Sequence, residues 1–191
     1  MNGVAVLSKL EKPVVSRKDL PGEDEVEASR YLEVKIKDLI IACIYLPNGN
    51  PTPGPKFDYK MRWFERLDAH AEMLITSGKK VLLIGDFNVI PTENDVYKPE
   101  KYKNDGLFLP EVRKAFENLI SQGWTDALRH LYPTETIYTF FDYFRKAYER
   151  NAGMRIDHFL LSPEVVPFLK KGHVDKDVRG WEKSSCNLRV W

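Results

Sequence analysis

Residues 81–88 read VLLIGDFN, and this segment decides how the rest of the chain is interpreted. The apolar run Val81–Ile84 predicts a short buried strand. Gly85 follows at once and permits a turn or a close approach of the backbone to another group. Asp86 and Asn88 stand two residues apart, so their side chains point the same way in an extended chain. The segment therefore predicts a carboxylate and an amide oxygen at the end of a rigid element.

Two kinds of chemistry and one structural alternative fit this pair. A carboxylate and an amide oxygen are ligands that a hard cation such as Mg²⁺ accepts. The same pair can act on a water molecule as a base and a polarising group. The alternative is a plain turn, because Gly-Asp-x-Asn is common in turns. The motif alone leaves all three interpretations open.

The segments outside this motif have the patterns of a protein with mixed strands and helices. The alternation of apolar and charged residues over 30–37 predicts a half-buried strand, and the run LIIACIY over 39–45 predicts a buried one. Residues 13–24 are expected to be a polar connection. Further elements are predicted as strands over 3–7, 154–161 and 174–178, and as helices over 57–77 and 110–123.

The helix over 57–77 has the clearest pattern. Its apolar residues recur at steps of three and four, which predicts one buried stripe, and Gly78 fits a helix stop. The second helix begins at Pro110, a favoured first residue of a helix. The predicted stripe of the first helix consists of Phe57, Met61, Phe64, Leu67, Ala71 and Leu74.

Strands and helices follow one another without a strict strand–helix–strand rhythm. This order favours a layered α/β sandwich over a doubly wound parallel sheet. No Pro/Ser-rich linker divides the chain, so residues 1–191 are predicted to form a single domain.

Composition narrows the class of protein only in part. The 29 Lys and Arg residues nearly balance the 28 acids, for a net charge of +1, which neither supports nor excludes a nucleic-acid partner. No apolar run approaches the roughly 18 residues of a membrane span, and no secretory signal opens the chain. Two cysteines are too few for a disulfide scaffold, so a reduced, cytoplasmic compartment is expected.

A second candidate site residue is Asp157, in the segment Arg155-Ile156-Asp157-His158. It begins a strand made for burial, and a buried carboxylate needs a hydrogen bond or an ionic partner. Orienting a catalytic histidine is one solution, and a structural ion pair with Arg155 or a nearby loop is the other. His158 is expected to face the other way and to be structural.

A third candidate is the segment Tyr45-Leu46-Pro47-Asn48-Gly49, which follows the strand over 39–45. Tyr45 and Asn48 are both able to donate to a phosphate oxygen. An edge tyrosine followed by a turn would explain the segment equally well. Three predicted buried strands thus each have a polar residue at one end. Active sites are often assembled from such residues at one edge of a sheet.

At these residues the sequence resembles exodeoxyribonuclease III and its apurinic/apyrimidinic endonuclease relatives. The resemblance rests on YLPNG (45–49), GDFN (85–88) and RIDHFLLS (155–162), in this order and at roughly this spacing. Further matching segments are NGVAVLS (2–8), DGLFLPEVRKAF (105–116), GWTDALRHLYP (123–133) and YTFFDYFRKAYERNAGMRID (138–157).

The resemblance implies a four-layered α/β sandwich, in which two packed mixed sheets are flanked by helices. It implies a DNA-repair phosphodiesterase that cuts double-stranded DNA on the 5′ side of abasic sites or trims 3′ ends. The implied cofactor is Mg²⁺, with Mn²⁺ as an alternative, and the implied metal ligands are Asp86 and Asn88. A complete member of the family would be a monomer with no membrane partner.

The resemblance also assigns catalytic roles. Asp86 would align and deprotonate the attacking water, and Asn88 would hold the phosphate. Tyr45 would contact the phosphate or assist the leaving oxygen, while Asp157 would orient a histidine.

The same resemblance implies substrate contacts. Asn48 and Asn151 would touch the DNA backbone. Phe141, within the aromatic segment over 138–143, would form a wall of the abasic pocket, although core packing is the better explanation for most of these aromatic residues.

Two departures from the family pattern concern the ends of the chain. The family begins with a strand carrying an Asn and a strand ending in a metal-binding Glu, and nothing before Gly3 supplies either. The family ends with Ser-Asp-His-x-Pro-Val, where this chain has Cys186 in place of the Asp and Asn187 in place of the His. Since Asn cannot exchange a proton near neutral pH, little or no activity is expected.

Two other functions remain open at this stage. One is a phosphatase of the same superfamily that acts on small phosphoesters. The other is a non-catalytic DNA-binding fragment, which salt-dependent binding without cleavage would reveal.

Overall fold

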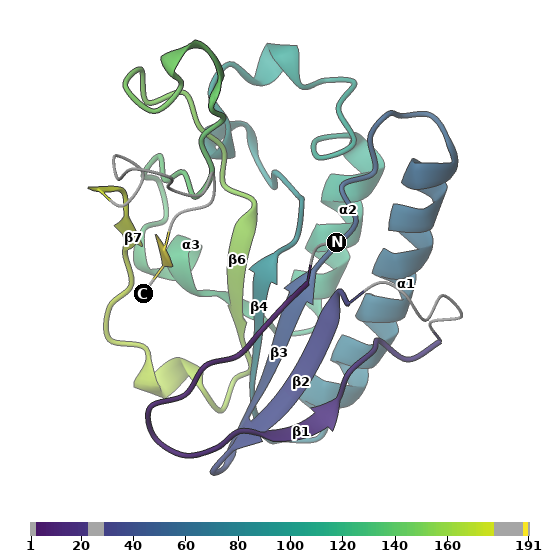
Figure 1. Ribbon diagram of the computed structural model, residues 1–191, viewed down its shortest axis with the longest axis vertical. Helices are drawn as coiled ribbons and strands as arrows, with labels where there is room; N and C mark the ends of the chain where they lie inside the picture. Colours follow the sequence, from purple (N-terminus) through teal and green to yellow (C-terminus); the bar gives the residue numbers. More distant parts are fainter. Residues whose placement is uncertain (1–2, 23–28, 178–188, 191) are drawn as a thin grey trace.

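The computed structural model describes residues 3–22, 29–177, 189 and 190. Six strands of these residues form one mixed sheet in the order β1-β2-β3-β4-β6-β5 (Figure 1). β3 and β4 run parallel, and every other neighbouring pair is antiparallel. The strands are β1 (Val14–Arg17), β2 (Tyr31–Ile36), β3 (Leu39–Tyr45), β4 (Lys80–Asp86), β5 (Thr125–Asp126) and β6 (Asp157–Leu161).

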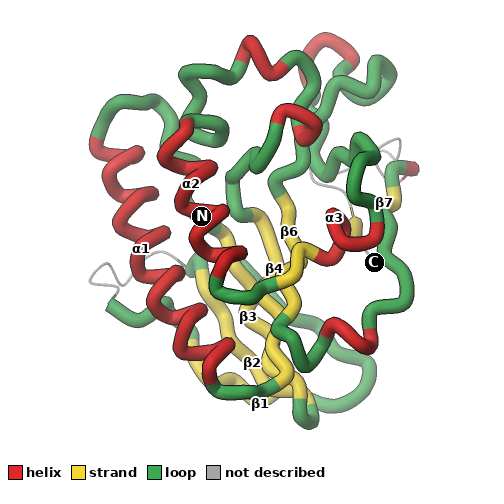
Figure 2. Tube along the Cα trace, turned by 180° about the vertical axis from the view of Figure 1, so that it is seen from behind, coloured by secondary structure: helices red, strands yellow, loops and turns green. Residues whose placement is uncertain are grey.

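Two long helices, α1 (Pro55–Thr76) and α2 (Pro110–Ser121), lie together on one face of this sheet (Figure 2). The short helix α3 (Ala127–Leu131) contacts β6, and β7 (Val174–Asp175) pairs with β8 (Arg189–Val190). Four short 3₁₀ turns, Glu93–Asp95, Pro99–Lys101, Phe144–Lys146 and Val166–Phe168, lie in the connections. No helix in the described part of the chain is long and apolar enough to cross a membrane.

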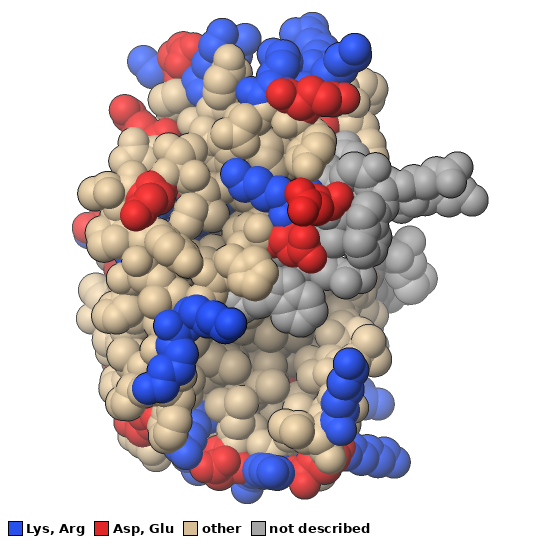
Figure 3. Space-filling view, turned by 90° about the vertical axis from the view of Figure 1, so that its left-hand side faces the viewer, with Lys and Arg blue, Asp and Glu red and all other residues tan. Residues whose placement is uncertain are grey.

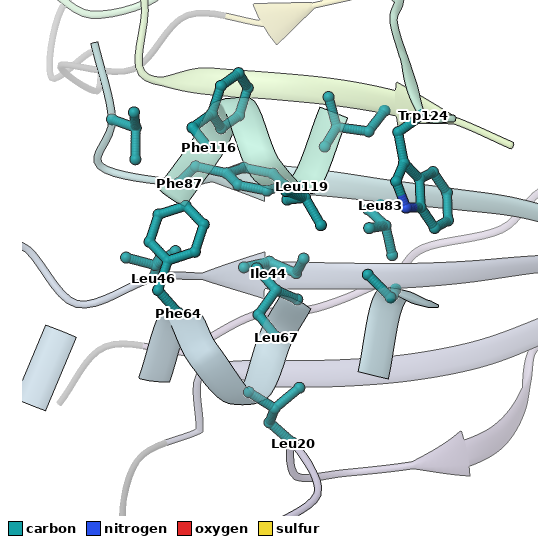
Figure 4. Packing of buried hydrophobic residues seen from close by; sticks show 14 of the residues in the cluster. Leu20, Ile44, Leu46, Phe64, Leu67, Leu83, Phe87, Phe116, Leu119 and Trp124 are labelled. Atoms are coloured by element: carbon teal, nitrogen blue, oxygen red, sulfur yellow. The ribbon is translucent and has the colours of Figure 1, made fainter. Parts of the chain in front are cut away.

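The main core fills the space between the two helices and the sheet. Side chains of α1 and α2, such as Phe64 and Phe116, point toward those of β3 and β4, such as Ile44 and Leu83 (Figure 4). Successive strand residues alternate between faces. Because Ile44 and Leu83 face the helices, Tyr45 and Asp86 face the opposite side of the sheet.

Most predicted elements are present, with changed bounds. The predicted strand over 39–45 matches β3, and the strand over 30–37 matches β2. The strand predicted from residue 154 begins only at Asp157, because Met154 forms isolated bridges to Val96 and Phe140 instead of a continuous ladder.

The strand predicted over residues 3–7 is wrong. Residues 3–7 form no strand, and their side chains alternate between half-buried and exposed without a ladder. The first strand, β1, lies in the segment expected to be a polar connection. All four of its side chains, including the apolar Val14 and Val15, are exposed, so it joins the sheet edge through its backbone and has no buried face that an apolar–polar alternation would indicate.

The buried face of α1 also differs from the predicted stripe. Phe57 and Met61 are only half-buried, whereas Lys60 and His70 are buried with the apolar residues. The stripe is therefore rotated toward Lys60, which lies one turn before Phe64.

An α/β fold with a mixed sheet flanked by helices is confirmed by these elements and by the related structures reported below. The four-layered arrangement and the single domain remain predictions. Val178, the last residue of the strand predicted over 174–178, lies outside the described residues. So do Cys186 and Asn187, the two departures from the family pattern.

Candidate active site

Three of the proposed catalytic residues lie side by side on adjoining strands. Tyr45 at the end of β3 pairs with Asp86 at the end of β4, and Asp86 pairs with Asp157 at the start of β6. Side chains of paired residues project from the same face of a sheet, within reach of one another. We call this row of three half-buried residues the Asp86 edge. The structure thus brings together residues that are 112 positions apart, since Tyr45 and Asp157 lie at its two ends.

Gly85 makes the parallel approach of β3 and β4 possible at this point. Its φ is +133°, and a side-chain carbon there would collide with the main-chain carbonyl of Ile44. The close approach expected from the sequence is therefore an approach of backbone to backbone. It fixes the spacing of the two strands one residue before Tyr45 and Asp86.

Asn88 is held at every polar atom. Its N–H donates to Asp86 Oδ1 at 2.8 Å, and its side-chain Nδ2 donates to the carbonyl of Leu46 at 2.8 Å. Its Oδ1 accepts from Asn48 Nδ2 at 3.1 Å. Its backbone is left-handed, with φ of +49°, a conformation that asparagine tolerates better than most residues. Asn88 is therefore a rigid, 4% exposed group beside the Asp86 edge.

Asn48 joins this arrangement from the loop after β3. Its Oδ1 accepts from the N–H of Asn50, while its Nδ2 reaches Asn88. The residue itself is exposed. Asn48 and Asn88 consequently form an amide pair with one partner buried and the other facing solvent.

The sequence prediction missed Lys60, whose ammonium lies beneath this amide pair. Lys60 is fully buried and donates to the main-chain carbonyls of Asn48 and Asn88. Burial lowers the pKa of this ammonium to about 7, opposed by the charges of Asp105 and Asp86. The sequence feature that could have indicated a buried lysine is its spacing, because Lys60 stands four residues before Phe64 of the predicted apolar stripe.

Arg155 stabilises the start of β6. Its Nε donates to Asp95 Oδ1, and its Nη1 donates to Asp126 Oδ2, each at 2.7 Å. Arg155 thus bridges two carboxylates from other parts of the chain, and an ion pair of Asp157 with Arg155 or a nearby loop stays a prediction. The N–H of Asp157 donates to the buried Thr139 Oγ1 at 3.1 Å.

His158 lies on the face opposite Asp157, as the alternation of the strand requires. It is fully buried, and its Nε2 is 3.0 Å from the carbonyl of Val89. A carbonyl can only accept, so this nitrogen carries a proton. His158 therefore holds a loop in place and has no face toward the Asp86 edge.

Phe141 and Asn151, two of the predicted substrate contacts, lie in the connection between α3 and β6. Phe141 is fully buried and packs against Tyr138 and Tyr148, so it offers no exposed face to a substrate. Asn151 is exposed on the loop before β6, with a left-handed φ of +49°. Its N–H donates to the carbonyl of Tyr148.

A cavity of about 560 Å³ lies between the loops that precede α2 and β6. Its walls combine basic and aromatic side chains, and Figure 3 shows Lys and Arg, with acidic residues among them, at the end of the molecule where these loops lie in Figure 1 and also at the opposite end. The lining includes Tyr97, Lys98, Lys101, Tyr102, Phe144, Arg145 and Arg150.

The described residues do not form a complete metal site. Within them, no group of three or more His, Cys, Asp or Glu side chains is placed to hold an ion. Asn88, one of the two predicted ligands, already uses both of its amide atoms in hydrogen bonds. Asp86 is left as the carboxylate of the predicted pair, and one carboxylate does not enclose a divalent cation.

Comparison with known proteins identifies the family. The family model described as Endonuclease/Exonuclease/phosphatase family matches residues 1–185. The exodeoxyribonuclease of Bacillus subtilis is 30% identical over 190 residues, which cover 99% of this chain and 74% of the relative. An AP endonuclease from Archaeoglobus fulgidus superposes with a TM-score of 0.89 at 33% identity, covering 95% of this chain and 70% of that structure.

A third similar protein is the 3′ phosphatase NExo from Neisseria, whose structure was solved with a product DNA hairpin. It has a TM-score of 0.88 and 33% identity, and the match covers 93% of this chain and 70% of that one.

The chain belongs to the endonuclease/exonuclease/phosphatase family, a class of hydrolases, as the sequence motifs predicted. It spans between 60% and 75% of the length of three of the curated relatives it matches. Enzymes of the exodeoxyribonuclease III type depend on a divalent metal ion.

Proposed function

We propose that this chain is a DNA phosphodiesterase of the exodeoxyribonuclease III type with weak or no catalytic turnover of its own. The observation that carries the proposal is the Asp86 edge, flanked by the fixed amide pair of Asn48 and Asn88. Carboxylates and amide donors beside one another suit the alignment of a water molecule against a phosphodiester.

Each residue has a proposed role in that reaction. Asp86 aligns the attacking water and accepts its proton. Asn88, whose backbone is pinned, holds the phosphate through the second N–H of its side-chain amide, and Tyr45 donates to a phosphate oxygen or to the leaving oxygen. Asp157 orients an imidazole in relatives that have one. Asn48 contacts the DNA backbone from the solvent side of the amide pair.

The proposed substrate is double-stranded DNA with abasic sites or 3′ ends. The basic and aromatic loops around the 560 Å³ cavity support a DNA partner, because Lys and Arg neutralise phosphates and release counterions. Asn151 belongs to this loop region and is proposed to contact the backbone there. Phe141 is left out of the proposed interface because it is fully buried.

The proposed cofactor is Mg²⁺, which supplies positive charge at the scissile phosphate when bound. Asp86 is the oxygen ligand that this chain is proposed to offer. The described residues do not complete a site for the ion.

Weak turnover is proposed from Cys186 and Asn187. By the register of the sequence they replace an Asp and a catalytic His of the family. An amide cannot shuttle a proton near neutral pH, and loss of a general acid–base group costs about a hundredfold or more.

The test is a comparison of wild type with the double variant Cys186→Asp/Asn187→His. The substrates are one duplex with a tetrahydrofuran abasic analogue and one with a 3′-phosphate end. We expect salt-dependent binding by both proteins, and EDTA-sensitive cleavage about a hundredfold faster in the double variant. Adding Asp86→Asn to the double variant should abolish the gain without abolishing binding, whereas the exposed control Asp58→Asn should leave it intact.

Each outcome bears on a separate part of the proposal. Wild type that binds neither duplex contradicts the DNA function. Rapid EDTA-sensitive cleavage by wild type contradicts the weak turnover. A double variant no faster than wild type contradicts the roles assigned to positions 186 and 187.

A further inference from the structure

Lys60 is unusual because all of its hydrogen-bond acceptors are main-chain carbonyls. Its Nζ lies 2.6 Å from the carbonyl of Asn88, 2.7 Å from that of Gly106 and 3.1 Å from that of Asn48. An ammonium has three N–H donors, so its hydrogen-bonding capacity is filled. Lys60 therefore joins three loops that come from different parts of the chain.

A buried charge at this position requires an explanation. The side chain is fully buried on α1, next to Trp63 and Phe64 in the helix face that packs on the sheet. Desolvation of a charge is costly, and an apolar residue would fill a helix face without that cost. The three carbonyls recover part of the cost only because each of them points at the ammonium.

The loops around Lys60 fit it closely. Gly49 has a φ of +89°, and a side-chain carbon there would lie 2.6 Å from Lys60 Cδ. The turn after Asn48 is thus folded over the lysine stem. Asn50, one residue further on, accepts from the N–H of Gly106 and donates to Asp105. These two hydrogen bonds join the loop after β3 to the loop before α2.

Two of the three carbonyls belong to residues of the candidate active site. The Asn88 N–H is held by Asp86 and its carbonyl by Lys60, so both ends of its left-handed backbone are fixed. The Asn48 carbonyl is held by the same ammonium, and the two side chains meet at 3.1 Å.

We propose that Lys60 is the positioning residue of the candidate active site. Its ammonium fixes the backbones of Asn48 and Asn88, and through them the amide pair that faces the phosphate. Lys60 does not touch the substrate, and its effect on DNA binding passes through Asn48 and Asn88.

The first test measures the amide pair directly and does not depend on the proposed function. The side-chain NH₂ signals of Asn48 and Asn88 are recorded by ¹H–¹⁵N NMR in wild type, Lys60→Met and Lys60→Gln. We expect both signals to move or broaden in Lys60→Met and to move less in Lys60→Gln, which keeps N–H donors. The signal of Asn118, exposed on α2, and the matched variant Lys56→Met, exposed on α1, should show no change.

The second test is a double-mutant cycle on binding to the tetrahydrofuran duplex, and it rests on the proposed function. Lys60→Met should weaken binding by about tenfold in wild type, but by less than about twofold when Asn48 and Asn88 are both already alanine. A merely structural lysine would weaken binding equally in both backgrounds.

The outcomes separate the two proposals. Unchanged Asn48 and Asn88 signals in Lys60→Met overturn the positioning role, as does an equal loss of binding in both backgrounds. A wild type that binds no duplex overturns the proposed function, while the NMR signals still decide the role of Lys60. If Lys60→Met does not fold, the shifts in Lys60→Gln decide it in the same way.

Discussion

Two buried cations hold the chain around the Asp86 edge, and they do so by opposite means. Lys60, fully buried, has three neutral carbonyl partners. Arg155, 2% exposed, has two carboxylate partners, Asp95 and Asp126. Lys60 fixes the backbone of loops after β3 and β4, whereas Arg155 cross-links side chains ahead of β6.

The difference determines what is left when either cation is removed. Without Lys60, three carbonyls lose a donor, but they carry no net charge. Without Arg155, the fully buried Asp95 keeps Arg129 as its ionic partner among the described residues, and Asp126 keeps the longer contact to His158 Nδ1, at 3.8 Å. An uncompensated buried charge is more costly than an unsatisfied neutral group. The two centres should therefore respond differently to the same substitution.

The largest effect is expected for Arg155→Met. It should lower the free energy of unfolding by about 3–5 kcal/mol, because buried carboxylates lose their counter-charge. Urea unfolding followed by circular dichroism measures the loss. The control is Lys114→Met, which breaks the exposed ion pair with Glu117 and should cost less than about 1 kcal/mol. Equal losses in the two variants would show that the Asp95–Arg155–Asp126 bridge contributes no more to the free energy of unfolding than an exposed ion pair does.

A smaller effect is expected for Lys60→Met. Three carbonyls lose a donor, but the cost of burying an ammonium disappears, so the loss should be about 1–3 kcal/mol in the same assay. The exposed neighbour Lys56→Met should change stability by less than about 0.5 kcal/mol. A loss in Lys60→Met that exceeds the loss in Arg155→Met would reverse the comparison and show that main-chain partners hold a cation more strongly than carboxylates do.

The strands that form the Asp86 edge could be predicted because their signals are local. The run over 39–45 and the segment over 81–88 each hold their own evidence, namely an apolar run that stops at polar residues. β3 has the predicted bounds, and β4 is longer by one residue at its start and by Gly85 and Asp86 at its end. The alternation of strand residues also predicted that His158 faces away from Asp157.

The partners of the two buried cations could not be predicted, because they depend on contacts distant in sequence. Arg155 bridges to Asp95, 60 positions away, and Lys60 reaches Gly106, 46 positions away. Lys60 stands four residues before Phe64, a spacing that fits the apolar stripe, but this spacing indicates no acceptor for the charge. The edge strand β1 was missed for a related reason, since it pairs through its backbone and buries no side chain.

The response to acid should also separate the two centres. Burial raises the pKa of Asp95, but the charge and hydrogen bond of Arg155, with Thr92 and Arg129, bring it below its ordinary value. Burial likewise opposes ionisation of Asp126, and His158 and Arg155 hold its pKa well below the ordinary range. Lowered carboxyl pKa values give stability that is complete above about pH 4 and is lost as the pH falls further.

The expected measurement is the slope of unfolding free energy between pH 4 and pH 3. Each carboxyl that is protonated only in the unfolded state contributes up to about 1.4 kcal/mol per pH unit. Arg155→Met should have a flatter slope than wild type, because Asp95 and Asp126 lose one of the groups that lower their pKa values. Lys60→Met should retain the wild-type slope, since its partners do not titrate. A flattened slope in Lys60→Met would mean that the two centres are coupled.

The smallest effect concerns two glycines with left-handed backbone, Gly49 and Gly78. Gly78, after α1, has a φ of +64°, and a side-chain carbon added there would meet nothing within 4 Å, so Gly78→Ala tests backbone strain alone, at about 1 kcal/mol. Gly49→Ala adds a contact of 2.6 Å to Lys60 Cδ, and the lysine stem cannot move away because it is fully buried. Overpacking of this kind adds about 1 kcal/mol or more, so Gly49→Ala should be the less stable variant.

Gly49→Ala should also shift the Asn48 and Asn88 side-chain signals, which Gly78→Ala should leave unchanged. Equal stability and unchanged signals in the two variants would mean that the turn at Gly49 can lift off Lys60, and that the lysine does not hold this loop.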